Sequence, residues 1–362
     1  MSHATDLTDR GTVDSTADPV TQTEVELKFI VPPDRLEALA ADMRQGKVQA
    51  RRLLAIYYDT VDGRLAGSSV SVRLRREGRR WVQTAKAPTS DPLRRLEHNV
   101  VRTVPRAHEV PALDLGLHDG TPVGFAIREA VRSLGTETPQ APLVERFRTD
   151  VSRLTRIESF EGARVKLALD VGEIVAGNRS RPVCEFEIEL KSGPVPGLFG
   201  LAANWTGRHG LWLSSVSKSR RGMRLASDEN VNAVSANVPI VDASAGPEHF
   251  LVAMMRSCLQ QIVGNASEIG AGATDEELVH QLRVGLRRMR TALRELARFA
   301  PGLDPDWELA FRSAFQALGA HRDEVTVLPA MRKEMKLAGL DCAETSSLSA
   351  AAPRLEAVVQ KP

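Results

Sequence analysis

The sequence predicts an α+β fold in two parts: an antiparallel β-barrel with helices packed outside it, followed by an all-helical domain. Two patterns predict this. Before residue 226, roughly eight segments alternate charged with apolar residues at a period of two, which is typical of β-strands. Beyond residue 246, apolar residues recur every three or four positions, which is typical of amphipathic helices.

The first expected strand, Thr23–Ile30, carries the pattern most clearly. Glu24, Glu26 and Lys28 point to one face of such a strand, and the apolar residues between them point to the other. A later segment, Cys184–Lys191, repeats the alternation with three glutamates on one face. The charged face of a lone strand is usually solvated, so repetition in other strands decides the interpretation.

The remaining expected strands show the same alternation. They are Arg52–Thr60, Ser69–Glu77, Trp81–Lys86, Arg95–Thr103, Leu143–Val151, Arg156–Glu161 and Arg164–Asp170. A closed antiparallel barrel explains why acids and bases sort onto one face, because apolar side chains then pack outward and charges line the interior. Burying so many charges is costly unless they are paired, hydrated or bound to ions. The lining is therefore predicted to be a functional site.

The chain of 362 residues is long enough for two domains with separate cores. Its net charge of +2 comes from 48 basic and 46 acidic residues, so local charge patterns matter more than the total. Three scattered cysteines form neither a disulfide framework nor a zinc site, which indicates a reducing cytoplasm. No signal peptide or membrane span is expected. We expect a disordered tail over residues 1–20, a barrel over 21–226, a linker over 227–246 and a helical domain over 247–362.

The charged faces combine carboxylates with lysines and arginines. Roughly four to six carboxylates, with no His or Cys among the candidate ligands, favour hard cations such as Mg²⁺ or Mn²⁺. The bases suited to a polyanion are Arg73, Arg75, Lys86, Arg148, Lys166 and Lys218. A site that holds both carboxylates and bases must bind an anion that also chelates metal. A phosphate chain is the predicted ligand. For phosphoryl transfer to water, positioning and charge neutralisation supply most of the catalysis.

Five short motifs, in order, resemble the CYTH domain of the triphosphate tunnel metalloenzyme superfamily. They are Glu24-x-Glu26-x-Lys28, Tyr58-Asp59-Thr60, Arg73-x-Arg75, Arg95-x-Glu97 and Glu185-x-Glu187-x-Glu189. The resemblance covers residues 21–226 and implies an eight-stranded antiparallel tunnel, divalent-metal dependence and triphosphate substrates. Family members include inorganic triphosphatases, thiamine triphosphatases, adenylate cyclases and RNA triphosphatases, so the fold alone does not choose among them.

The resemblance also implies roles for individual charged residues. Catalysis is assigned to Lys28, Glu24 and Glu26. The expected metal ligands are Glu24, Glu26, Glu97, Asp170, Glu187 and Glu189. The expected phosphate ligands are Lys28, Arg73, Arg75, Lys86, Arg148, Lys166, Lys218 and Arg221.

After the expected linker, an apolar stripe from Leu278 to Leu296 predicts a helix with a basic row beside it. The row is His280, Arg283, Arg287, Arg290 and Arg294. The segments Val279–Val284 and Leu318–Asp323 resemble two motifs of the CHAD domain, which often follows CYTH domains and is associated with polyphosphate binding. CHAD domains normally have two similar helical halves, so we expect a partial CHAD domain here. A solvated face, or pairing with acids of a neighbouring helix, is the alternative use of the row.

The expected function is metal-dependent hydrolysis of inorganic triphosphate to diphosphate and phosphate by a cytoplasmic enzyme, because the chain resembles CYTH–CHAD inorganic triphosphatases. The helical domain is expected to bind polyphosphate. The alternatives are a CYTH-type adenylate cyclase, another organic triphosphatase and a non-catalytic polyphosphate-binding protein. Nucleic acid is a less favoured ligand of the arginine row than polyphosphate.

Overall fold

The computed structural model describes residues 22–91, 94–103, 109–132, 142–242, 244–300, 302–304, 306–322 and 328–337. The tail expected over residues 1–20 lies outside this range. The chain divides into two compact units, which we describe separately. Residues 1–24 and 54–145 form the first unit, and residues 25–53 and 146–362 form the second.

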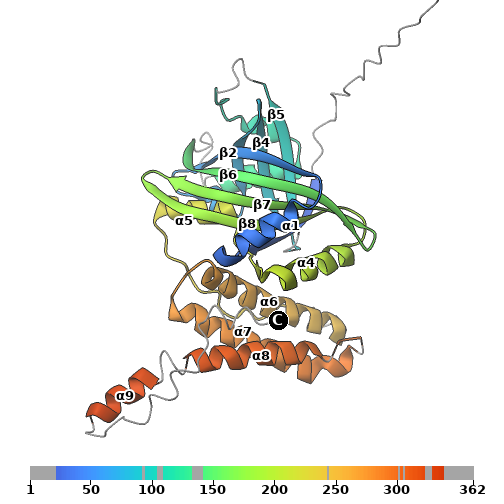
Figure 1. The fold of residues 1–362 in the computed structure, drawn as a ribbon, viewed down its shortest axis with the longest axis vertical. Coiled ribbons are helices and arrows are strands. Elements are labelled where there is room, and N and C mark those ends of the chain that lie inside the picture. The colour runs from blue at the N-terminus through green and yellow to red at the C-terminus, as the bar shows by residue number, and fades with distance from the viewer. Residues whose placement is uncertain are drawn as a thin grey trace, which may run out of the picture. The chain divides into compact units, whose positions relative to one another are not determined.

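Within the described residues, eight long strands and one short strand form a single sheet (Figure 1). They are β1 (Gln22–Ile30), β2 (Val48–Thr60), β3 (Ser71–Glu77), β4 (Arg80–Pro88), β5 (Arg94–Arg102), β6 (Leu143–Phe160), β7 (Ala163–Ala176), β8 (Arg179–Ser192) and β9 (Trp212–Leu213). Their order is β5-β4-β3-β2-β6-β7-β8-β1-β9, and β5 also pairs with β1, which closes the sheet. The predicted antiparallel barrel is confirmed.

Helices lie between the strands and make up the region after them. They are η1 (Pro33–Arg35), α1 (Leu36–Met43), α2 (Arg64–Gly67), η2 (Leu115–His118), α3 (Pro122–Val131), α4 (Val195–His209), α5 (Lys218–Ser227), α6 (Pro247–Gly270), α7 (Glu276–Leu296), η3 (Ala297–Phe299), α8 (Asp306–Arg322) and α9 (Leu328–Leu337). Pro at the first or second position begins α3, α4 and α6, where its fixed φ suits a helix start.

The strands expected at Leu143–Val151 and Arg156–Glu161 are one continuous strand, β6, of 18 residues. No glycine or proline interrupts the residues between them. β6 pairs with β7 through a tight turn at Glu161 and Gly162, both of which have positive φ (46° and 76°). Two successive positive φ values are the geometry that suits a two-residue hairpin.

In the second unit, the apolar faces of β1, β7 and β8 pack against α1 and α4. Leu39 and Met43 of α1 and Trp205 of α4 are fully buried in this core. Because side chains alternate along a strand, the same packing turns the charged residues of these strands to the opposite face. The first unit is built alike, with Val72 of β3 and Ala85 of β4 packed against α2 and α3.

The helical region of the second unit packs α6 against α7 and α7 against α8 (Figure 1). The predicted apolar stripe of α7 is buried at Leu278, Leu282, Leu286, Met289 and Leu293. This confirms that the stripe faces the helical core. At the start of α7, Asp275 accepts a hydrogen bond at 2.9 Å from the backbone N–H of Glu277 and so caps the helix.

The segment expected as a linker is hydrogen-bonded along α6 and α7. Residues 229–242 form neither helix nor strand. The Asn265 side chain accepts from the Val234 N–H and donates to the Val234 carbonyl, both at 2.9 Å. Arg288 of α7 donates to the Asn237 carbonyl at 2.8 Å. These bonds fix the segment to the helices, so it is not a free spacer.

Two buried histidines in the first unit form a hydrogen-bonded pair, with Nδ1 of His98 2.8 Å from Nδ1 of His118. The Gln83 amide nitrogen donates to the Asp114 carbonyl at 2.6 Å, and its oxygen accepts from Arg102 at 2.6 Å. The same nitrogen lies 3.0 Å from Nε2 of His118. Nε2 is therefore an acceptor, and Nδ1–H of His118 donates to His98. Burial, together with repulsion from His98, lowers the pKa of His118 to about 4.

This pair predicts that the first unit loses stability in acid. The pKa of His118 is 6.5 when unperturbed and about 4 in the fold, so the unfolded chain binds more protons between these values. The free energy of unfolding therefore falls as pH decreases through this window, by about 3 kcal/mol in full. Urea midpoints from pH 7 to pH 4 should fall more steeply in the wild type than in His118→Gln. Equal slopes would contradict the assignment of a neutral, buried His118.

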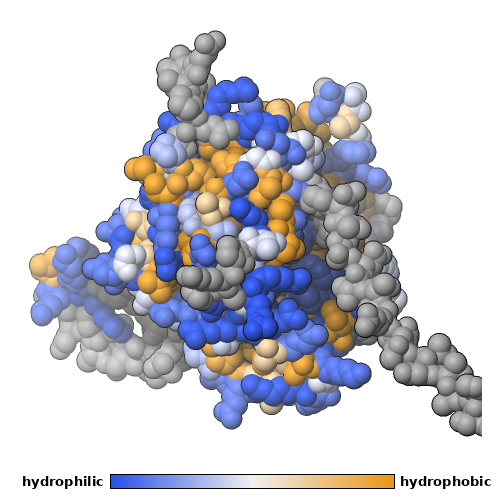
Figure 2. Space-filling model, turned by 90° about the horizontal axis from the view of Figure 1, so that it is seen from above, coloured by the Kyte–Doolittle hydropathy of each residue, from blue (hydrophilic) through white to orange (hydrophobic). Residues whose placement is uncertain are grey.

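Figure 2 shows a face on which hydrophilic residues are interspersed with hydrophobic ones. In the part of the chain that the structure describes, no helix combines the length and apolarity needed to cross a membrane. Cys184 and Cys258 are free thiols.

Candidate functional site

On the charged face of the second unit, neighbouring strands bring carboxylates directly opposite one another. β8 pairs with β1 on one side and with β7 on the other. Glu189 stands opposite Glu26, and Glu185 stands opposite Asp170. Like charges in such positions destabilise a sheet. We define the acidic cluster as these residues together with the one between them on β8: Glu26, Asp170, Glu185, Glu187 and Glu189.

Bases in the same rows neutralise the acidic cluster. Lys28 stands opposite Glu187 in the register of β1 and β8, and Lys166 of β7 stands opposite Glu189. The Lys28 ammonium lies 2.7 Å from the Glu26 carboxylate. Lys166 is ion-paired to Glu189, as is Lys191. Each acid at this end of the cluster therefore has an ammonium partner.

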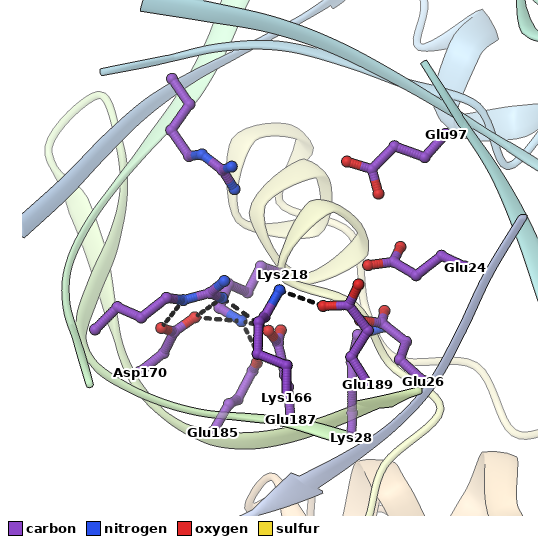
Figure 3. Close-up of polar contacts among 12 residues, drawn as sticks. Glu24, Glu26, Lys28, Glu97, Lys166, Asp170, Glu185, Glu187, Glu189 and Lys218 are labelled. Atoms are coloured by element: carbon purple, nitrogen blue, oxygen red, sulfur yellow. Dashed lines mark hydrogen bonds and ion pairs between the residues drawn. The ribbon is translucent and has the colours of Figure 1, made fainter. Parts of the chain in front are cut away.

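The other end of the acidic cluster converges on Lys218 (Figure 3). Its ammonium lies 3.0 Å from Asp170, 2.5 Å from Glu185 and 2.8 Å from Glu187. Arg153 of β6 donates to both Asp170 oxygens at 2.6 Å and to Glu187 at 2.7 Å. Asp170 is fully buried, so its charge depends on these two partners.

Glu187 and Asp170 are held ionised by the bases around them. Burial alone would raise the pKa of Glu187, but Lys218 and Arg153 outweigh it and hold the pKa well below its usual range. The same two bases lower the pKa of Asp170 against its burial. Burial would lower the pKa of Lys218, yet the surrounding carboxylates, Glu185 first, raise it well above 10.5. Carboxylates and ammonium are both charged at neutral pH.

The first turns of α5 supply Lys218 and Arg221, whose guanidinium donates to Glu185 at 2.5 Å. Ser217 caps α5 by accepting from the Arg220 N–H at 3.1 Å. Gly222 then allows close contact with β6, because a Cβ there would lie 2.2 Å from the ring of Phe147. This close packing fixes the helix that presents both bases.

The first unit has a second charged group, centred on Lys86 of β4. Lys86 is ion-paired to Glu24 and lies 3.0 Å from Glu97, which also accepts from Asn99 at 2.8 Å. Burial would raise the pKa of Glu97, but Lys86 and then Arg73 hold it far below its usual range.

Two predicted phosphate ligands of the first unit lie on β3. The Arg73 guanidinium donates to the Tyr57 hydroxyl at 3.0 Å, and Nε of Arg75 donates to Glu77 at 2.8 Å. Both arginines are half-buried.

Among the predicted phosphate ligands, the one on β6 lies on the exposed side of its strand. Arg148 is exposed, whereas Phe147 and Thr149 beside it are buried. Phe147 packs against Gly222 of α5, so the face of β6 opposite Arg148 is the one that α5 covers. The residue that β6 contributes is Arg153, which the sequence analysis missed. Arg153 is separated from Phe147 and Val151 by even numbers of positions and so lies on the same face of β6. That spacing could have identified it from the sequence.

The clusters offer only oxygen ligands to a metal, and ionised carboxylates suit the hard cations Mg²⁺ and Mn²⁺. By this chemistry the residues fit a divalent ion. Among the described residues, no three acids, histidines or cysteines stand together as a preformed metal centre. The expected ligands Glu24, Glu26, Glu97, Asp170, Glu187 and Glu189 are instead ion-paired to lysines or arginines.

The basic row of α7 divides into packed and exposed members. Arg290 donates to Glu308 of α8 at 2.8 Å, and Arg283 stacks on Phe315 with 5.0 Å between the guanidinium carbon and the ring centroid. His280, Arg287 and Arg294 are exposed. Pairing with a neighbouring helix thus accounts for part of the row.

Comparison with known proteins identifies both regions. The CYTH domain family matches residues 22–223, and the CHAD domain family matches residues 253–361. The inorganic triphosphatase of Haemophilus influenzae is 28% identical over 210 residues, which are 57% of this chain and 56% of that protein, so the match spans about half of the relative's length.

Solved structures are similar at lower identity. A candidate adenylyl cyclase from Hippeastrum with a dominant triphosphatase activity is 17% identical, covers 56% of this chain and 95% of its own, and has a TM-score of 0.37. A candidate adenylate cyclase from Bacillus halodurans is 18% identical, covers 51% and 91%, and has a TM-score of 0.36. Because the family match takes in more than half of the residues, the chain belongs to the CYTH domain family and carries a CHAD domain after it.

Proposed function

We propose that this chain hydrolyses inorganic triphosphate to diphosphate and phosphate in the presence of Mg²⁺ or Mn²⁺. One observation carries the proposal. The strand register places carboxylates opposite carboxylates, and buried lysines and arginines neutralise them. Such an arrangement is costly for stability and suits a ligand that brings both anionic oxygens and cations. The curated relative that is named an inorganic triphosphatase supports the choice of substrate.

The charged residues divide by role. Lys28 and Lys166, which contact acids at the half-buried end of the cluster, are assigned to phosphate oxygens, as are Lys218 and Arg221 from α5. Arg73, Arg75 and Lys86 of the first unit keep the same assignment. Glu24, Glu26, Glu97, Glu187 and Glu189 are assigned to the metal.

For Asp170 we propose a role other than that of a metal ligand. Its two oxygens already accept from Arg153 and Lys218 in a fully buried position. We assign Asp170 to holding these bases in place, together with Glu185, which pairs with Lys218 and Arg221. Lys28, Glu24 and Glu26 remain the proposed catalytic residues.

The bound state requires an exchange of partners. Lysines that now contact carboxylates would contact phosphate oxygens, and the released carboxylates would contact the cation. A bound divalent ion would supply neutralisation of phosphate charge and a lowered pKa of the attacking water.

A product assay on a substrate panel tests the proposal. The full chain is incubated with inorganic triphosphate, ATP or thiamine triphosphate, each with Mg²⁺, Mn²⁺ or excess EDTA. We expect diphosphate and phosphate from inorganic triphosphate with either metal and no products with EDTA. Cyclic AMP from ATP would favour the adenylate cyclase. Binding of polyphosphate with no turnover of any substrate would favour the non-catalytic alternative.

We propose in addition that the CHAD domain binds polyphosphate through the exposed members of its basic row. Arg287 and Arg294 lie seven residues apart on α7 and are exposed, so they stand on one face of the helix. Arg290 and Arg283 contact α8 and are assigned to packing as well as to charge.

Salt dependence checks this binding. Each phosphate contact releases about 0.7 counterions, by analogy with a single strand. Replacing both Arg287 and Arg294 by alanine should therefore flatten the log–log slope of affinity against salt by about one unit. Polyphosphate titrations of the full chain at several salt concentrations measure it, with Glu248→Ala as a control on the exposed start of α6. A slope unchanged from wild type would leave the row as a solvated face.

A further inference from the structure

The C-terminal end of α6 contacts the segment that carries the phosphate-binding lysines. Ser267 and Glu268 are buried although both are polar. The Ser267 hydroxyl accepts from the Ser215 N–H at 2.9 Å. Arg224 of α5 donates to Glu268 at 2.5 Å, and both side chains are mostly buried, at 14% and 8% exposure. The helical region is thus joined to α5 and to the segment before it by specific polar contacts.

Close packing accompanies these bonds. Gly270 lies against Trp212, and a Cβ at Gly270 would come within 2.4 Å of the indole ring. A side chain there would push the two apart. Trp212 belongs to β9, which pairs with the end of β1.

Two paths lead from this contact to the proposed site. The Ser214 N–H donates to the backbone carbonyl of Lys28 at 2.8 Å. Ser214 is next to Ser215, so the chain that contacts Ser267 is also hydrogen-bonded to the backbone of the proposed catalytic lysine. On α5, Lys218, Arg221 and Arg224 follow one another at intervals of three and so share one side of the helix. The first two bind acids of the cluster, and the third binds Glu268.

We propose that Glu268 and Arg224 are positioning residues for the reaction: their ion pair sets the placement of α5, and with it Lys218, so that the CHAD domain is a working part of the triphosphate site. This inference rests on the proposed function. It gives the buried pair a purpose beyond stability, since an isolated buried pair contributes little on its own. It also predicts that the helical region cannot be altered at this contact without a change in kinetics.

A double-mutant cycle on the full chain tests the inference. Arg224→Ala and Glu268→Ala should each lower kcat/KM for inorganic triphosphate by about tenfold, because a small displacement of a positioned group costs one to two orders of magnitude. The double variant should lose no more than either single variant, since both remove one contact. Arg224→Lys should recover most of the loss. Arg220→Ala, an exposed position on the same helix, is the control and should match wild type.

The outcomes separate the two proposals. Thermal unfolding is recorded for every variant, and kinetics are measured well below each Tm. Should Glu268→Ala fail to fold, Glu268→Gln takes its place. A lower Tm with kcat and KM unchanged would show a purely structural pair and overturn the positioning role. A wild-type chain that binds inorganic triphosphate without hydrolysing it overturns the proposed function alone, and Kd from calorimetry then replaces kcat/KM in the cycle. A wild-type chain that does neither overturns both.

Discussion

Replacing Glu26 by glutamine is expected to lower kcat/KM for inorganic triphosphate by about 10³-fold, since loss of a metal-bound carboxylate removes several kcal/mol of charge stabilisation. Glu26 stands opposite Glu189 and is ion-paired to Lys28. Removing its charge relieves repulsion between the two strands. The fold should therefore survive with an unchanged or higher Tm.

Glu173→Gln is the matched control for this experiment. Glu173 is an exposed carboxylate on β7, in the same unit but outside the acidic cluster. Initial rates with saturating Mg²⁺ should match wild type in the control and be nearly abolished in Glu26→Gln. Turnover by Glu26→Gln at the wild-type rate would remove Glu26 from the catalytic residues.

Replacing Lys218 by methionine is expected to give the largest loss of stability, about 3–5 kcal/mol, because it removes one partner from a buried ion network. Three carboxylates contact this ammonium, and two of them, Asp170 and Glu185, are almost fully buried. The loss should shrink as pH falls, since the carboxylates left without Lys218 can then protonate.

Urea unfolding at pH 7 and pH 5 measures this effect, with Lys47→Met as a control at an exposed lysine. The control should unfold with the wild type at both values. A Lys218→Met protein as stable as the control at pH 7 would show that the network does not depend on Lys218.

Alternation alone was sufficient to predict the barrel. The apolar residues of β1, β7 and β8 form the core with α1 and α4, and Glu26, Lys28, Lys166, Glu187 and Glu189 share the opposite face as expected. The period of two fixes a face for every residue of a strand, and a shift by one residue would bury the charges against α1 and α4.

Sequence patterns are least informative where a face changes character along one strand. On β6, Phe147 and Val151 are buried and Arg153 on the same face reaches Asp170, whereas Arg148 lies on the opposite, exposed face. Which helix covers which part of a strand depends on contacts distant in sequence. The same holds for Arg224 and Glu268, which are 44 residues apart and carry no local motif.

The acids' present partners could not be predicted either. Sequence spacing places a carboxylate and a lysine on one face, but whether they bind each other or a ligand depends on burial and on the third partner. Asp170 illustrates this, because its bidentate contact with Arg153 was not among the expectations and makes it an anchor for bases.

Anomalous diffraction from crystals soaked with Mn²⁺ and the non-hydrolysable imido analogue of triphosphate tests the exchange of partners most directly. We expect manganese peaks beside the carboxylates of Glu26, Glu187 and Glu189, with Lys28 moved from Glu26 and Lys166 moved from Glu189 to phosphate oxygens. Manganese and analogue bound elsewhere, with the Lys28–Glu26 and Lys166–Glu189 ion pairs intact, would contradict it.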